Sequence, residues 1–206
     1  MLQPSSYFSS VLYTIEKPEL LSGALNASND ALDKIEKTTE MHDVYQNIMS
    51  GSLIGDPRVS ELENFIANAG WSILDNQGYN MDNFMTFLSE FWAQKHHKFS
   101  GMEQHVHPHG VALSGFYFLE CPEGGCMAEF HDPRPGKVQS SLPYKDLSII
   151  REANNSVFVV PKPGMLLITN SWLPHSFTRN TSDVPVKFIH FNISVMAAKE
   201  RAPIVV

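Results

Sequence analysis

The sequence has little cysteine. Its two cysteines, Cys121 and Cys126, bracket the segment Pro-Glu-Gly-Gly. Two thiols with no second pair of ligands do not form a zinc pattern, so we expect reduced thiols at the ends of a turn. A disulfide that closes a hairpin is the alternative. Reduced thiols favour a cytoplasmic location.

The sequence also lacks an excess of positive charge and a long apolar run. A formal net charge of −7 argues against a general nucleic-acid-binding protein, which would need a basic face. No window approaches the ~18 apolar residues of a membrane span, and the first residues do not follow the signal-peptide pattern. Because 43% of the residues are hydrophobic and 18% charged, we expect a globular protein with a full apolar core.

Helical patterns dominate the first 90 residues. Apolar residues at helical spacing predict helices within residues 24–41 and 57–76, and a strand is expected near the start, at 7–15. The segment 81–94 (MDNFMTFLSEFWAQ) fits a short helix, with a strand that begins near Glu90 as the alternative.

Beyond residue 90 the sequence is typical of β-structure. Apolar and β-branched runs separated by turn residues predict strands at 111–120, 127–130, 156–161, 165–173 and 186–195. This pattern favours an α+β protein whose all-β core is a double-stranded β-helix, that is, a cupin-like jelly roll. We expect a single domain over residues 1–206. Residues 1–89 would form a mainly helical support that covers one sheet, and residues 90–200 the core.

Three histidines alternate in the segment GMEQHVHPHG: His105, His107 and His109. Residues two apart on a strand point to the same face, so His105 and His107 can bind one cation. The best third ligand is His175, which follows an apolar strand in the segment SWLPH. Three protein ligands with open positions suit metal-dependent oxygen chemistry. His109 follows Pro108, and we expect it in a solvated loop.

We expect the remaining histidines to have structural roles rather than to bind a metal. We expect the pair at 96–97 in a polar strand end or loop, because Lys flanks it on both sides. His131 is expected to form a local hydrogen bond with Asp132. His190 lies between Ile189 and Phe191, which is typical of a core histidine whose hydrogen bonds are satisfied.

The order of these motifs resembles the 2-oxoglutarate/Fe(II)-dependent oxygenases. From Glu90 to Val195 the chain carries HVHP, SGFYFLE, a Gly-Gly turn, EFHDPRP, PKPGMLLITNSWLPH and FIHFN. This set is similar to a bacterial and phage branch with the pattern H-x-H-P…SG-x-YY…DPR…SWLxH…FN. The resemblance implies a non-haem Fe(II) enzyme of hydroxylase type that uses O₂ and 2-oxoglutarate, with oxidative decarboxylation of 2-oxoglutarate to succinate.

The resemblance also implies the metal ligands. It places the first histidine at His105, the usual acidic ligand at His107 and the distal histidine at His175. The chain therefore offers a histidine where a carboxylate is usual. Either the site has three histidines, which we prefer, or Asp132 completes a site of two histidines and one carboxylate.

A cation on the strand after the distal histidine normally binds the far carboxylate of 2-oxoglutarate in this superfamily. Val186 occupies the aligned position in this chain. Lys187 would face the other way unless a bulge turned it inward, and Arg179 is the other cation nearby. The resemblance further implies that the Tyr117 hydroxyl contacts the co-substrate and that Asn192 lines the same pocket.

The leading hypothesis is therefore a 2-oxoglutarate-dependent dioxygenase in the cytoplasm of a bacterial or phage-infected cell. The alternatives are a cupin-type metal-binding protein or dioxygenase that does not use 2-oxoglutarate, and a catalytically inactive relative. Cupins usually carry a glutamate shortly after HxH, where this chain has Val111 and Ala112. The expected partners are the small co-substrate and O₂, without membrane or nucleic acid. The primary substrate and a homodimeric assembly stay open.

Overall fold

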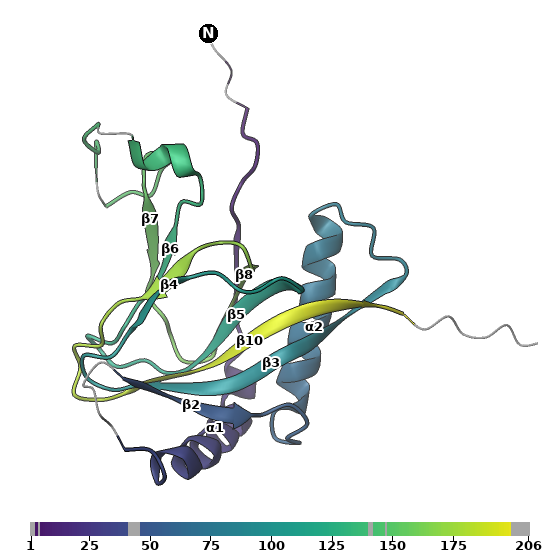
Figure 1. The fold of residues 1–206 in the computed structure, drawn as a ribbon, viewed down its shortest axis with the longest axis vertical. Helices are drawn as coiled ribbons and strands as arrows, with labels where there is room; N and C mark the ends of the chain where they lie inside the picture. The colour runs from purple at the N-terminus through teal and green to yellow at the C-terminus, as the bar shows by residue number, and fades with distance from the viewer. Residues whose placement is uncertain (1–2, 4, 41–45, 140–141, 147, 199–206) are drawn as a thin grey trace, which may run out of the picture.

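A computed structural model describes residues 3, 5–40, 46–139, 142–146 and 148–198. Two antiparallel sheets form the core (Figure 1). The large sheet has the strand order β1-β8-β5-β10-β3-β2, and the small sheet has the order β4-β9-β6-β7. The elements are β1 (Leu12–Glu16), η1 (Pro18–Leu20), α1 (Leu21–Glu36), β2 (Asn47–Ser52), α2 (Ser60–Asn76), β3 (Phe84–His96), β4 (Met102–His105), β5 (Val111–Glu120), β6 (Ala128–His131), η2 (Pro135–Gln139), β7 (Ser156–Val159), β8 (Met165–Asn170), β9 (His175–Phe177) and β10 (Val186–Ala197).

The large sheet is buried on both faces. Alternate residues of β5 enter two different clusters: Tyr117 packs with the residues of α1 and α2, whereas Phe116 and Phe118 pack with Phe177 and Phe188 between the two sheets. Helices outside one sheet and a second sheet on its other face make this a jelly roll, which confirms the expected fold class. The expected cover of one outer sheet face by the helices is also present.

The first 89 residues contribute more than helical support. Strands β1 and β2 and the start of β3 belong to the large sheet. The short helix considered for residues 81–94 is wrong, because β3 runs without interruption from Phe84 and pairs with β10 over its length. Pairing with a distant strand overrides a helical apolar pattern here. The predicted helix end at Met41 and residues 199–200 of the predicted core lie outside the described residues.

The strand predictions after residue 90 agree well with the structure. The prediction for 111–120 matches β5. Strands β7 and β8 lie within their predicted ranges, and β6 and β10 overlap theirs and extend slightly beyond them. Cys121 and Cys126 are both free thiols, as expected. The neighbouring Gly124 has a positive φ of 73°, which suits glycine at the turn between β5 and β6.

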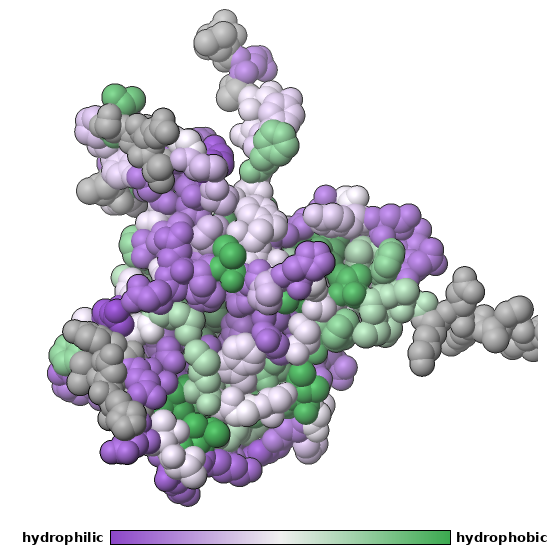
Figure 2. Space-filling view, in the orientation of Figure 1, coloured by the Kyte–Doolittle hydropathy of each residue, from purple (hydrophilic) through white to green (hydrophobic). Residues whose placement is uncertain are grey.

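The surface differs from one end of the molecule to the other. On the face in Figure 2, hydrophilic residues predominate over the arm that contains β6 and β7. Apolar surface lies where β3 begins and β10 ends, at the exposed side chains of Phe84, Met85 and Met196. Neither α1 nor α2 is long and apolar enough to cross a membrane.

His96 ends β3, so its expected place at a strand end is confirmed, but the expected polar surroundings are wrong because it lies inside the barrel. Its side chain is fully buried, and its ring contacts the rings of Phe177 and Phe188. Burial is the main cause that lowers the pKa of His96 to about 4, and the neighbouring His97 acts in the same direction. The imidazole is therefore neutral in the folded protein at neutral pH.

This burial predicts a loss of stability in acid. The unfolded chain takes up a proton on His96 at a pKa of about 6.5, whereas the folded protein does so only near pH 4. The unfolded state thus binds more protons between these values, and the free energy of unfolding falls as the pH drops through them. At pH 5 the loss from this residue amounts to about 2 kcal/mol.

Urea unfolding at pH 7 and pH 5 measures this effect. We expect the drop in unfolding free energy for His96→Leu to be smaller by about 2 kcal/mol than for the original protein. Equal drops in the two proteins would show that His96 does not titrate differently in the folded and unfolded states.

Candidate metal centre

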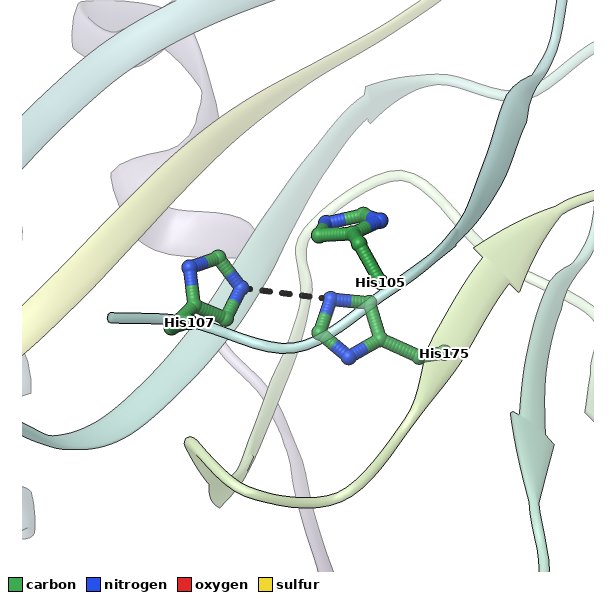
Figure 3. A group of neighbouring side chains, drawn as sticks. All are labelled: His105, His107 and His175. Carbon is green, nitrogen blue, oxygen red and sulfur yellow. Dashed lines mark hydrogen bonds between the residues drawn. The ribbon is translucent and has the colours of Figure 1, made fainter. Parts of the chain in front are cut away.

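Three histidines from different parts of the jelly roll converge on one point (Figure 3). His105 ends β4 and lies opposite His175, the first residue of β9, in the antiparallel pairing of these strands. His107 lies just beyond β4, and its backbone N–H donates a hydrogen bond to the carbonyl of Ser171 (3.0 Å). The pairing of β4 with β9, which has an irregularity between Met102 and His105, and one backbone bond therefore position all three side chains.

The spacing of the ring nitrogens suits a single metal ion. One nitrogen from each ring lies within 4.8 Å of the others, and Nε2 of His107 is 3.3 Å from Nε2 of His175. Two imidazole nitrogens that bind one ion at right angles, each at roughly 2.1 Å, lie about 3 Å apart. The three imidazoles thus fit the donor set of a metal site.

Backbone carbonyls fix the orientation of two of these rings. Nδ1 of His105 lies 2.8 Å from the carbonyl of Glu103, and Nδ1 of His175 lies 2.9 Å from the carbonyl of Leu173. When Nδ1 donates to these carbonyls, the lone pair of Nε2 is free for a metal. The hydroxyl of Ser114 lies 2.9 Å from Nε2 of His107, so it is well placed to donate to that ring.

The environment favours neutral imidazoles, the form that binds metals. Burial is the main cause that lowers the pKa of His107 to about 3, and repulsion from His175 and His105 adds to it. Burial likewise lowers the pKa of His175 to about 4, against the effect of the Leu173 carbonyl. Both rings are therefore unprotonated at neutral pH.

Asp132, the alternative ligand, is not part of this group. Its carboxylate accepts hydrogen bonds from Nε (2.9 Å) and Nη2 (2.6 Å) of Arg134, and this guanidinium holds the pKa of Asp132 below its usual range. Asp132 therefore braces the turn after β6. His109 lies exposed in a turn, as expected.

Two of the residues expected at the co-substrate site face the helices instead. The Tyr117 hydroxyl donates to the carbonyl of Lys17 (2.7 Å), and the ring belongs to the cluster between the large sheet and the helices. The Lys187 ammonium donates to Asn29 in α1 (2.8 Å) and to Glu120 (3.3 Å). A register shift does occur after Lys187, but it does not turn the side chain inward.

Arg179 and Asn192 lie in different surroundings. Arg179 donates from Nη2 to the Glu103 carboxylate (2.8 Å), and its side chain is 45% exposed. Asn192 is fully buried two residues after His190, on the inner face of β10, and its Nδ2 donates to the Glu90 carboxylate. Of the four predicted co-substrate residues, the structure thus places Asn192 beside the histidine group.

Sequence reasoning missed two residues of this inner face. His190 is buried and stacks on His107, with ring centroids 5.0 Å apart and an angle of 16° between the rings. Its Nε2 has no hydrogen-bonding partner in the part of the chain that the structure describes, so the expected satisfied core histidine is wrong. Trp92 on β3 also contacts His190, with ring centroids 4.5 Å apart. His190 and Asn192 are two residues apart in β10 and therefore share a face of the strand. This spacing could have indicated that His190 lies on the inner face.

His131 also differs from its expected role. Its Nε2 lies 2.9 Å from the hydroxyl of Ser176, and its Nδ1 lies 4.0 Å from the Glu129 carboxylate. The expected hydrogen bond with Asp132 is therefore wrong, because Asp132 lies beyond the end of β6 and its carboxylate is bound by Arg134 instead.

A comparison with protein families identifies the chain. The family model described as "Putative 2OG-Fe(II) oxygenase" matches residues 90–192, which are 103 of the 206 residues. The chain belongs to this family of 2-oxoglutarate- and Fe(II)-dependent oxygenases. Fe(II) and 2-oxoglutarate are accordingly its cofactor and co-substrate, and the cupin alternative is not favoured.

Solved structures with the same fold support this assignment at the level of architecture. One is AviO1 from Streptomyces viridochromogenes Tue57 (TM-score 0.62, 13% identity, 90% of each chain covered). Another is a prolyl-4-hydroxylase from Pseudomonas putida (TM-score 0.57, 10% identity, 89% of this chain and 91% of that chain). The epimerase SnoN, in complex with Fe3+, alpha ketoglutarate and nogalamycin RO, is also similar (TM-score 0.56, 13% identity, 91% and 81%). Curated protein sequences give no match.

Proposed function

We propose that His105, His107 and His175 hold the Fe(II) of this oxygenase in a site of three histidines. The observation that carries the proposal is the convergence of three ring nitrogens within 4.8 Å. Hydrogen bonds from two Nδ1 atoms to backbone carbonyls support it further. Bound Fe(II) would supply O₂ activation coupled to oxidative decarboxylation of 2-oxoglutarate, and the expected outcome is hydroxylation of a substrate C–H bond.

The protein's own residues would orient the ligands and exclude water. The rings of Phe116 and Phe130 lie 5.6 and 5.9 Å from the ring of His175 and form an apolar wall beside it. This wall keeps His175 neutral and lowers the local dielectric constant, which strengthens electrostatic interactions in the site. Ser114 would turn its hydroxyl away from Nε2 of His107 when that nitrogen binds the metal.

A groove next to His175 is the proposed entry for the primary substrate. It has a volume of about 810 Å³ and includes Phe130 and Leu173, both of which contact His175. His131 and Arg134 add polar groups to its lining. Such a mixture of apolar and polar groups suits a small metabolite or a side chain of a protein.

We also propose that the chain acts as one domain in a reducing cytoplasm. Strands β1, β2 and β3 from the N-terminal half share the large sheet with β5, β8 and β10. The free thiols of Cys121 and Cys126 favour a reducing compartment.

The test is an anaerobic spectrum of the protein with Fe(II) and 2-oxoglutarate. We expect one Fe(II) per chain and a weak visible charge-transfer band that appears only when 2-oxoglutarate is added. The variant His109→Ala should give the same band, because His109 is exposed in a turn. Full iron loading without the band would contradict the use of 2-oxoglutarate, and failure to bind iron would contradict the three-histidine site.

A further inference from the structure

The inner face of the large sheet carries polar atoms that lack partners. Trp92 on β3 and His190 on β10 are direct neighbours in the pairing of these strands. In the described part of the chain, neither Nε1 of Trp92 nor Nε2 of His190 has a hydrogen-bonding partner, although both atoms are buried. Buried donors in folded proteins nearly always have a hydrogen-bonding partner, so two such atoms side by side require an explanation.

These atoms lie directly beside the metal centre. The His190 ring contacts both Trp92 and His107, with ring centroids 4.5 Å and 5.0 Å apart. Asn192, two residues further along the same face, has an Oδ1 atom that is likewise buried without a partner. Burial is the main cause that lowers the pKa of His190 well below its usual range, so the ring between these atoms is neutral.

The position where a relative would carry its cation is apolar in this chain. Val186 and Phe188 both lie in the cluster between the two sheets, with 0% exposure. Lys187, between them, is bound to Asn29 and Glu120 on the helix side. The distal carboxylate of 2-oxoglutarate therefore does not find its usual cation on this segment of β10.

We propose that Trp92 and His190 bind the distal carboxylate of 2-oxoglutarate through two neutral N–H donors. The indole Nε1 can only donate, and the imidazole Nε2 donates in the tautomer that carries its proton there. A carboxylate has only acceptor oxygens and can receive both bonds. The inference rests on the proposed function, because it requires the keto acid to bind at the three histidines, one ring away from His190.

The experiment compares two keto acids that differ only in this carboxylate. Fe(II)-loaded protein is titrated without oxygen with 2-oxoglutarate and with 2-oxopentanoate, which has the same chain length and ends in a methyl group. Calorimetry gives each Kd, and the charge-transfer band reports binding at the metal independently of turnover. We expect the original protein to bind 2-oxoglutarate at least about tenfold more tightly than 2-oxopentanoate.

Two variants remove the donors and keep the aromatic rings. In Trp92→Phe and in His190→Phe, the preference for 2-oxoglutarate should shrink to about threefold or less, whereas the Kd for 2-oxopentanoate and the iron content stay the same. Trp71→Phe is the matched control, because the indole N–H of Trp71 already donates to the carbonyl of Phe84 in the helix layer (3.0 Å). Lys187→Met serves as the second control, and both controls should keep the full preference.

Several results would overturn the inference. An unchanged preference in both donor variants would do so, as would a preference lost in Lys187→Met. A protein that binds both keto acids equally well at the metal would contradict the carboxylate site but leave the proposed function intact. A protein that binds iron but neither keto acid would contradict both.

Discussion

Replacing His175 with alanine is expected to abolish iron binding and every signal that depends on 2-oxoglutarate. The variant loses one of the three proposed ligands, and His175 is the most buried of them, with 1% exposure. Loss of a group that merely supports a ligand typically weakens metal affinity 10–100-fold, so loss of the ligand itself should cost roughly 100-fold or more. Metal analysis after desalting, together with an anaerobic Fe(II) titration, measures the change.

Two controls separate this ligand loss from general damage and from the alternative site. His109→Ala removes an exposed imidazole from the same segment and should bind iron normally. Asp132→Asn should also bind iron normally, because Arg134 rather than the histidine group contacts its carboxylate. If His175→Ala kept its iron, or if Asp132→Asn lost it, the three-histidine site would be wrong.

The histidine group of the candidate metal centre could be predicted because two of its signals are local. Alternation in HVH brings two rings together, and a histidine just after a strongly apolar strand lies at the rim of a sheet. The three histidines then meet because β4 pairs with β9, and sequence alone could give this pairing only through resemblance to a family. The order of the motifs supplied that information.

The co-substrate residues could not be predicted in the same way. β5 is buried on both faces, so its sequence does not reveal whether Tyr117 or its neighbour Phe116 points toward the histidine group. The structure shows that the even-numbered residues 116 and 118 face inward and that Tyr117 faces the helices. For Lys187, the decisive contact is Asn29, which lies 158 residues away in the sequence.

For His96, too, the sequence does not reveal to which face of the strand the side chain points. Flanking lysines indicated a polar environment for His96, but Lys95 turns to the helices and binds Glu36 while His96 turns inward. In a strand, neighbouring side chains occupy opposite faces, so a charged neighbour says little about the burial of a histidine. The prediction failed for this geometric reason.

Replacing Gly115 with alanine is expected to destabilise the fold severely. Gly115 lies in the centre of β5 between β8 and β10, opposite Ile168 and Phe191. An added Cβ would collide with the carbonyl oxygen of Leu167 and would lie 2.5 Å from Cζ of Phe191. Because the carbonyl belongs to the paired backbone, it cannot move aside as a flexible side chain can. Overpacking of this kind typically costs about 1–3 kcal/mol, and the backbone clash places this variant at or above the upper end.

Gly51→Ala provides the matched control. Gly51 lies on edge strand β2, and an added Cβ there meets no atom within 4 Å. Alanine at that position should change the unfolding free energy by less than about 0.5 kcal/mol. Urea unfolding of both variants gives the comparison, and a Gly115→Ala protein as stable as Gly51→Ala would disprove the close packing of β5.

The same substitution links the fold to the candidate metal centre. Ser114 and Phe116, on either side of Gly115, point to the inner face, where one contacts His107 and the other lies beside His175. A shift of β5 away from Leu167 would move both contacts at once. Any Gly115→Ala protein that folds should therefore also bind Fe(II) more weakly than Gly51→Ala. Gly115 thus leaves room for the close approach of the β8 backbone at Leu167. The close approach also keeps the side chains of Ser114 and Phe116 directed at the histidines.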